Sequence, residues 1–259
     1  MSNQKKYFRS LSGGGLQINI SKKDILKIQI PLPPLEVQKQ IVEEIEGYQK
    51  IIDGARQVVD NWRPVIKVDP GWEIKKLEDI ADVTSSKRIF KNEYVERGVP
   101  FYRTKEIVEL YFGHPISLEL FISPNKYSEI RRKFDVPQQG EILISAVGTI
   151  GYSWVVPDNR EFYFKDGNLL WLKNIRAYPY YLQLVLDNLF TSINQLSAGA
   201  AYQALTIIKL KQVDIPLPSF EVQKQIVEKN NAERALIESA KTLIGIYEGK
   251  IKDKLAEVF

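Results

Sequence analysis

Three short clusters of basic side chains, interleaved with aromatic ones, stand in the middle of the chain. Arginine and lysine can neutralise phosphates, and arginine can donate paired hydrogen bonds to the edge of a guanine base. We therefore expect nucleic-acid contacts from Lys87, Arg88, Lys91, Tyr102, Arg103, Lys105, Arg131, Arg132 and Lys133. A single basic cluster is more often an ordinary solvated surface, so this expectation depends on the occurrence of three in one region.

Residue types for covalent or metal-dependent catalysis are scarce. The sequence has no cysteine and one histidine, His114, which excludes thiolate metal sites and sites that need two imidazoles. It contains no glycine-rich nucleotide fingerprint and no phosphate-binding loop. It also contains no pair of carboxylates at the spacing that nucleophilic catalysis requires. Gly13-Gly14-Gly15 could cradle a phosphate. The chain contains an internal repeat, described below, and the corresponding segment 185 residues later, Ala198-Gly199-Ala200, keeps only one glycine. We expect His114 to be a solvated loop residue, and the chain to be no enzyme and to bind no metal or cofactor.

Length and composition are those of an ordinary globular protein. The chain has 259 residues, 44% of them hydrophobic, and a mild net charge of +4. It can bury a substantial core and has room for one large domain with additional elements. No apolar run is long enough to cross a membrane, and the polar, basic N-terminus does not resemble a signal peptide. We therefore expect a cytoplasmic location.

An internal repeat organises the chain. The segment from Ile30 to Glu43 recurs from Ile215 to Glu228, 185 residues later, and only Pro34 and Leu35 differ, being replaced by Ser219 and Phe220. The alignment extends back without a gap to residue 11. Such a long period indicates a duplicated unit that consists of a domain, its closing strand and a helix. The sequence then holds the tail of one unit in residues 1–29, followed by one complete unit.

A long helical pattern follows each proline-rich segment, because the prolines cannot continue a strand but are tolerated at a helix start. In the first helix the apolar positions step by four and three residues, as in a coiled-coil seam. The second helix keeps this register, with Asn230 and Glu233 on the seam and with Leu236, Leu243 and Leu255 beside it. We expect the two helices to pair through Ile41, Ile45, Tyr48, Ile52, Val59, Ile226, Ile237, Ile244, Tyr247 and Ile251.

Between the helices we expect a mixed domain of helices and strands. Residues 141–145 and 152–156 predict two strands, joined by a tight turn at 148–151. Further strands are plausible at 100–104 and 168–172, and the apolar spacing of residues 178–196 predicts a helix. The predicted fold is α+β, with regions 30–63 (first helix), 64–215 (globular domain) and 216–259 (second helix). The two long helices are expected to pair with each other as a coiled coil.

These residues resemble the specificity (S) subunits of Type I restriction-modification systems over essentially the whole chain. In that family a target-recognition domain is followed by a proline-rich strand end, a Glu-x-Gln-x-x-Ile helix start and a long helix that pairs antiparallel with its counterpart. Glu36, Gln38 and Ile41 match this motif in the first copy, as Glu221, Gln223 and Ile226 do in the second. The resemblance therefore implies an antiparallel coiled coil for the two long helices. Residues 72–80 resemble the family's domain opening, and 140–144 with 148–151 resemble its central hairpin.

The resemblance implies a subunit that binds double-stranded DNA and two modification (M) subunits, which methylate adenine with S-adenosylmethionine. A separate restriction (R) subunit, which uses ATP, cleaves the DNA. S-adenosylmethionine, ATP and Mg²⁺ are thus expected on partner subunits and not on this chain. Family members of full length carry two recognition domains, whereas this sequence has one that is complete. We therefore expect a homodimer that reads two identical half-sites, although the surplus apolar surface of the second helix could instead bind modification subunits.

Two other interpretations stay open. One is a coiled-coil scaffold that binds only protein, and the other is a nuclease or methyltransferase whose site has diverged beyond detection. Duplex binding that weakens steeply with salt distinguishes the DNA-binding prediction from the scaffold. Turnover with Mg²⁺ or S-adenosylmethionine would reveal an enzyme.

Overall fold

The computed structural model describes residues 23, 26, 31–196 and 205–258, with the backbone alone for 191–196 and 258. The predictions for residues 1–29 and for the Gly13-Gly14-Gly15 segment lie outside the described residues. Contacts divide the chain into two compact units. The helical unit comprises Met1–Trp62 with Leu236–Phe259, and the globular unit comprises Arg63–Ala235.

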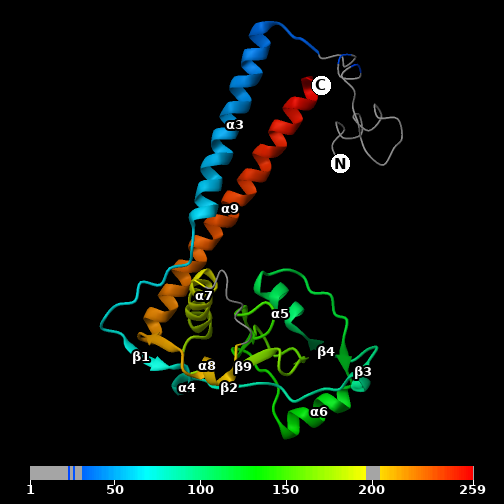
Figure 1. Ribbon diagram of the computed structural model, residues 1–259, viewed down its shortest axis with the longest axis vertical. Coiled ribbons are helices and arrows are strands. Elements are labelled where there is room, and N and C mark those ends of the chain that lie inside the picture. Colours follow the sequence, from blue (N-terminus) through cyan, green and yellow to red (C-terminus); the bar gives the residue numbers. More distant parts are fainter. Residues whose placement is uncertain (1–22, 24–25, 27–30, 197–204, 259) are drawn as a thin grey trace. The chain divides into compact units, whose positions relative to one another are not determined.

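The helical unit contains α3 (Leu35–Asn61) and the C-terminal part of α9 (Phe220–Val258), drawn in blue and red in Figure 1. The rings of Tyr48 and Tyr247 lie 5.4 Å apart, and Lys254 pairs with Glu44 at 2.8 Å. Arg56, further along α3, pairs with a residue further back on α9, Glu248. Residue numbers therefore rise along one helix as they fall along the other, so the helices are antiparallel, as predicted.

Most residues predicted to pair the helices are half-buried or buried within this unit. Ile52 and Ile237 are 1% and 6% exposed. The half-buried members are Ile41, Ile45, Tyr48, Val59, Ile244, Tyr247 and Ile251. Together they form the apolar seam that the spacing of the sequence indicates.

The first part of α9 belongs to the globular unit, and this corrects the predicted seam. Ile226 packs against the core of the globular unit. Asn230 is buried beside Leu184 of α7 (Pro179–Leu196), with Glu233 close by. The spacing of apolar residues continues along the whole of α9, but this first part of the helix packs on the globular unit and not on α3. Asn230 and Glu233 therefore occupy seam positions in the sequence pattern without facing another helix.

The globular unit contains two four-stranded sheets and one two-stranded ladder. The strand orders are β2-β9-β6-β7, β3-β5-β4-β8 and β1-β10, and the only parallel pair among the described strands is β4 with β8. The strands are β1 (Glu73–Lys76), β2 (Asp82–Thr84), β3 (Tyr94–Val95), β4 (Val99–Tyr102), β5 (Phe121–Ile122), β6 (Ile142–Ser145), β7 (Ser153–Val155), β8 (Tyr163–Phe164), β9 (Leu169–Lys173) and β10 (Asp214–Leu217). The remaining helices are α4 (Leu77–Ile80), the 3-10 helix η1 (Lys91–Glu93), α5 (Thr104–Tyr111), α6 (Pro124–Lys133) and α8 (Ile207–Lys211).

Both faces of the β2-β9-β6-β7 sheet are covered, which explains why its central strands β9 and β6 are apolar along most of their length. Ile142 and Ile144 of β6 point into a core cluster that includes Leu182 of α7. Leu143, between them, points to the opposite face, where it packs with Ile107 of α5. Successive strand residues alternate between the two sides, so this one strand supplies both clusters and fixes α5 and α7 on opposite faces.

The mixed α+β fold predicted from the sequence is confirmed. The β6–β7 hairpin, β4, β9 and α7 occur where the pattern placed them, with shifts at the ends. One detail was wrong: proline does not end the closing strand, because Pro216 lies inside β10 opposite Ile74. Among the described strands β10 pairs only with β1, so the missing N–H of Pro216 can face away from the ladder.

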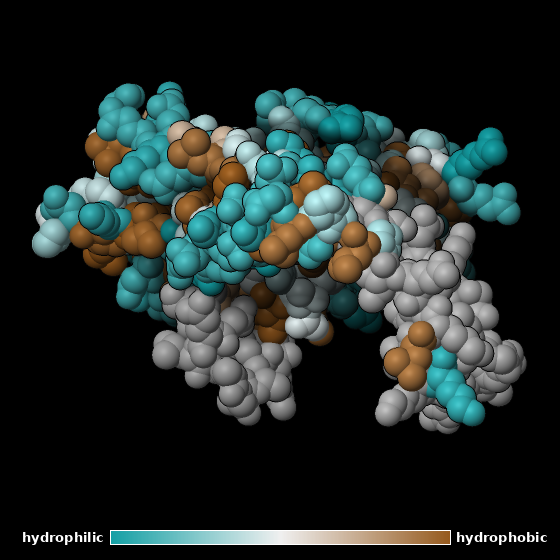
Figure 2. All heavy atoms as spheres, turned by 90° about the horizontal axis from the view of Figure 1, so that it is seen from above, coloured by the Kyte–Doolittle hydropathy of each residue, from teal (hydrophilic) through white to brown (hydrophobic). Residues whose placement is uncertain are grey.

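Several large hydrophobic side chains remain exposed in each unit. Val42 of α3 is 53% exposed and Leu236 of α9 is 69% exposed, whereas Phe90 of the globular unit is 60% exposed. On the face shown in Figure 2, hydrophobic residues occur in separate patches between hydrophilic ones. Isolated exposed residues of this kind are normal, so an interaction surface must be argued from particular side chains.

Candidate nucleic-acid interface

The first basic cluster lies on the segment that connects β2 to η1. Ser85 Oγ donates a hydrogen bond to the carbonyl of Leu169 (2.8 Å), and Ser86 Oγ donates one to the carbonyl of Phe164 (2.8 Å). Ile89 is buried. These contacts attach the segment to β8 and β9 and leave three basic side chains exposed, namely Lys87, Arg88 and Lys91.

The third basic cluster occupies the last turn of α6. The helix begins at a serine cap, where Ser123 Oγ accepts a hydrogen bond from the N–H of Lys126 (3.1 Å). Tyr127 and Ile130 are buried and hold the helix on the domain. Cations in the last turn are stabilised by the negative end of the helix dipole, and all three are exposed, namely Arg131, Arg132 and Lys133.

A contact between Lys87 and Phe134 brings the first and third clusters together. The Lys87 ammonium lies 5.0 Å from the centre of the Phe134 ring, a cation–π distance. Residues from two segments far apart in sequence therefore form one surface, here named the basic patch: Lys87, Arg88, Lys91, Arg131, Arg132 and Lys133.

The basic patch keeps an excess of positive charge. Three of its cations pair with carboxylates: Arg88 with Asp166 (2.9 Å), Arg131 with Glu161 (3.6 Å) and Lys133 with Glu129 (2.8 Å). Within the described parts of the chain, Lys91 and Arg132 have no carboxylate partner. Exposed ion pairs contribute little free energy, so a phosphate can compete for these cations at low cost.

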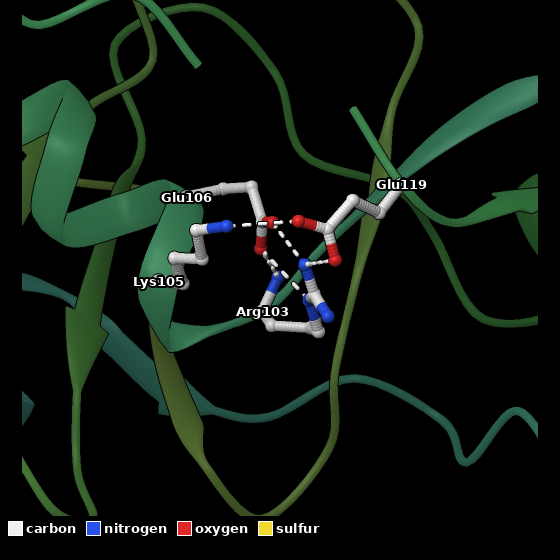
Figure 3. Close-up of polar contacts among 4 residues, drawn as sticks. All are labelled: Arg103, Lys105, Glu106 and Glu119. Atoms are coloured by element: carbon white, nitrogen blue, oxygen red, sulfur yellow. Dashed lines mark hydrogen bonds and ion pairs between the residues drawn. The ribbon is translucent and has the colours of Figure 1, made fainter. Parts of the chain in front are cut away.

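The middle cluster is organised differently (Figure 3). Arg103 precedes α5, and its guanidinium donates to Glu106 through Nε (3.2 Å) and Nη2 (2.6 Å). Nη2 also donates to Glu119 (2.8 Å), whose second oxygen accepts a hydrogen bond from Lys105 Nζ (2.8 Å). These four residues, here named the Arg103 cluster, form a continuous network of charge-assisted hydrogen bonds.

The electrostatics of the Arg103 cluster follow from these contacts. Glu106 is 2% exposed, so its charge requires the Arg103 partner. Lys105 and then Arg103 hold the pKa of the Glu119 carboxyl down to about 2. The hydrogen bond to Glu106 raises the pKa of Arg103 above its ordinary value. Two cations thus face two carboxylates, and the cluster is formally neutral.

Tyr102 contributes mainly to packing. Its ring stacks on Phe162, with centroids 4.6 Å apart, and burial raises the pKa of its hydroxyl. The structure therefore joins six of the nine predicted DNA-binding residues in the basic patch, sets Arg103 and Lys105 in a separate neutral network, and directs Tyr102 toward the core. A role in DNA contact remains a prediction for all nine.

Two residues of this region were missed from the sequence, Glu106 and Glu119. The position of Glu106, three residues after the residue that caps α5, is a capping-box spacing and could have been recognised. Glu119 is 16 residues from Arg103 in the sequence, and no periodic pattern of residues indicates their contact.

His114 is exposed, as predicted, with Nδ1 2.9 Å from Glu109. In the described residues there is no cluster of potential metal ligands and no helix that could span a membrane.

The fold and the site define a two-part α+β protein, with a basic patch on its globular unit and an antiparallel pair of long helices. The chain belongs to the family of the Type I restriction modification DNA specificity domain, whose profile matches residues 1–59 and 70–238. The match includes the first copy of the repeat and extends through the globular unit into α9.

Curated relatives show the same relationship at low identity. The chain is 28% identical over 236 residues to a protein of Haemophilus influenzae described as a type I restriction enzyme specificity subunit, covering 83% of this chain and 58% of that protein. It is 22% identical to the MjaVIII specificity subunit of Methanocaldococcus jannaschii, covering 91% of this chain and 62% of the relative. The chain thus spans about three fifths of the length of these relatives.

Solved structures share the fold. The HsdS subunit from Thermoanaerobacter tengcongensis is similar, with a TM-score of 0.57 and 20% identity, over 98% of this chain and 67% of that one. A chain from a structure of type I R-M complex assembly and conformational transition gives a TM-score of 0.64 at 21% identity, with the same coverage of both chains.

Proposed function

We propose that this chain is a DNA-recognition subunit of a Type I restriction-modification system and catalyses no reaction itself. The observation that carries the proposal is the family match, which covers most of α3, the domain that bears the basic patch, and α9 as far as residue 238. Six cations from two segments of the globular unit supply a surface for phosphates, with three carboxylates against them. The relatives whose names specify a role are called specificity subunits.

The partners in this proposal are double-stranded DNA, two modification subunits and a restriction subunit. S-adenosylmethionine, ATP and Mg²⁺ would bind to those subunits, and the assembly would be cytoplasmic. The helix pair would act as a scaffold that sets the distance between sites. With 27 and 39 residues, α3 and α9 are roughly 40 Å and 60 Å long at about 1.5 Å per residue.

A salt titration of duplex binding tests the DNA-binding proposal. We expect affinity to fall steeply with salt, and the triple variant R131A/R132A/K133A to flatten the slope by about 0.9 for each phosphate that the variant no longer neutralises. K241A is the matched control, because Lys241 is an exposed cation on α9 in the helical unit, paired with Glu238. Absence of salt-dependent binding to any duplex would favour the protein-only scaffold. Turnover with Mg²⁺ or S-adenosylmethionine would contradict the non-catalytic assignment.

The proposal includes a homodimer. Leu236, Leu243 and Leu255 of α9 are 69%, 39% and 36% exposed, so this helix offers apolar surface that α3 does not bury. Two copies related by a two-fold axis could cover it. Light scattering across a concentration series tests this: we expect twice the chain mass of 29.8 kDa, and L236D/L243D to abolish the dimer. A monomer at all concentrations would assign this surface to another partner.

A further inference from the structure

We infer that Arg103 determines sequence specificity by donating hydrogen bonds to a guanine base, and that Glu106 is its positioning residue. The inference rests on the proposed DNA-binding function and assigns different tasks to the two groups of cations. The basic patch would bind phosphates, and the Arg103 cluster would read a base pair.

The guanidinium of Arg103 is held in a fixed direction. A contact with a base edge needs donors held in one direction, whereas a phosphate, with oxygens on several sides, accepts hydrogen bonds over a wider range of directions. Glu106 holds the guanidinium through two of its nitrogens (Figure 3), and the Glu106 side chain is 3% exposed. Arg103 itself is 29% exposed, so it is both anchored and accessible. Side chains of the basic patch are more exposed, such as Arg131 at 62% and Arg88 at 68%.

Arg103 keeps hydrogen-bond donors that Glu106 does not use. Glu106 occupies Nε and one hydrogen of Nη2, and Glu119 accepts from Nη2 as well. Nη1 has no hydrogen bond to any residue in the described part of the chain. When Glu119 withdraws, Nη1 and Nη2 present two parallel N–H groups, which match the O6 and N7 acceptors of guanine. The inference requires Glu119 to release Nη2, and the Glu119 side chain, which is 45% exposed, has solvent beside it into which it can turn.

The charge balance of the Arg103 cluster favours a base edge over a phosphate. The Arg103 cluster is formally neutral, and its carboxylates would repel a phosphate that approached Arg103 or Lys105. A guanine edge carries no net charge, so it meets no such repulsion. The amino group of the paired cytosine can donate to a carboxylate, and Glu119 lies beside the guanidinium. A mixed surface of this kind suits a G·C pair and excludes the DNA backbone.

Selection from a pool of duplexes with a randomised central segment tests this inference. Wild-type protein should enrich a motif that includes a G·C pair. R103K keeps the charge but removes the paired donors, so it should weaken the preference at one G·C position by at least about tenfold. Its salt slope should stay unchanged. R132A should do the reverse, keeping the motif while lowering affinity for every duplex and flattening the slope.

E106Q tests the positioning role. Glutamine has nearly the same shape but no charge, so it holds Arg103 less firmly. We expect a smaller loss of discrimination at the same base position, with preferences elsewhere in the motif unchanged. A purely structural role of Glu106 would lower the melting temperature and leave the relative preferences intact, and would contradict this assignment.

The possible failures are distinguishable. If R103K selects the same motif at every position, Arg103 is not a base reader, even though the chain binds DNA. Salt-dependent binding without any enriched motif in the wild type would also overturn the inference and leave phosphate binding in place. If the wild type shows no salt-dependent binding to any duplex, the proposed function itself fails.

Discussion

The two copies of the repeat have nearly the same sequence and the same helix start but different surroundings. In each copy a glutamine side chain donates from Nε2 to a proline carbonyl five residues earlier, Gln38 to Pro33 at 2.7 Å and Gln223 to Pro218 at 2.8 Å. In the first copy Val42 is 53% exposed, whereas its counterpart Val227 in the second is 6% exposed.

The difference arises because only the second copy covers a folded domain among the described residues. In the second copy the start of α9 covers the core of the globular unit, and Gln223 Oε1 accepts a hydrogen bond from the N–H of Tyr178 (2.7 Å). In the first copy no described residue donates to Gln38 Oε1. Local sequence therefore fixes the turn and the helix start, and the residues opposite determine how much stability each copy contributes.

The largest difference should come from placing a charge at the two equivalent valines. V227D buries a carboxylate without a partner and should lower the free energy of unfolding by about 3 to 5 kcal/mol. V42D, the matched control, should change it by no more than about 0.5 kcal/mol. Urea unfolding of both variants measures this, and an equal decrease in both would mean that the first copy is also covered.

The second prediction concerns pH and the surface beside α9. Burial raises the pKa of Asp187 to about 7, and Ser153 Oγ donates to its carboxylate (2.8 Å). The folded state therefore binds a proton that the unfolded chain releases near pH 4. The stability from this group is full below about pH 4 and is lost as pH rises toward 7. Arg234 on α9 moderates the shift, and its counterpart on α3 is the uncharged Gln49.

D187N should remove this pH dependence. The stability of the wild type relative to D187N should fall between pH 4 and 7, as measured by urea unfolding at a series of pH values. As a control, Q57A on α3, where the exposed side chain carries no titratable group, should leave the pH profile unchanged. A D187N profile parallel to that of the wild type would mean that the pKa of Asp187 is not raised by folding.

The third prediction uses the repeated glutamine. Q223A leaves the N–H of Tyr178 without its acceptor and should cost about 1 to 3 kcal/mol. Q38A removes only the local bond to Pro33 and should cost about 0.5 kcal/mol. Thermal unfolding measures both, with E221Q as a control at an exposed position of the same turn. A similar cost for both glutamines would show that the local bond dominates.

The smallest effect should come from exchanging the residues that differ between the copies. Phe220 lies 5.8 Å from the ring of Tyr178, so F220L should cost about 0.5 to 1 kcal/mol because it removes the aromatic pair. The reverse exchange, L35F, introduces a ring that has no such partner on a residue 65% exposed, and we expect no measurable change. Differential scanning calorimetry can compare the two, and stabilisation by L35F would contradict the comparison.

Much of the fold could be predicted because its signals are local. The seam of α3, the apolar face of α7 and the β6–β7 hairpin depend on residues close together in sequence. The polar positions Asn230 and Glu233 were misplaced because one helix passes from a folded domain to a helix partner without a break in its period. The spacing of apolar residues indicates that one face of a helix is covered. It does not indicate whether a second helix or a folded domain covers that face.

The candidate interface was less predictable. The sequence indicated the three basic clusters but treated them as equivalent. The structure joined the first and third clusters through Lys87 and Phe134, which are 47 residues apart, and neutralised the middle cluster through Glu106 and Glu119. Such pairings depend on how loops and strands fold back on one another, which short-range patterns do not encode.

The sequence alone determined the duplication, the two helix starts and the family resemblance, because the motif from Ile30 to Glu43 is repeated almost unchanged 185 residues later. The tertiary structure decided which copy is buried, which cations remain available and which arginine is held by a buried carboxylate. The physical reason is that burial and charge depend on the surroundings of a side chain. Val42 and Val227 are identical residues in identical local sequence, and only the surface opposite each one sets its exposure.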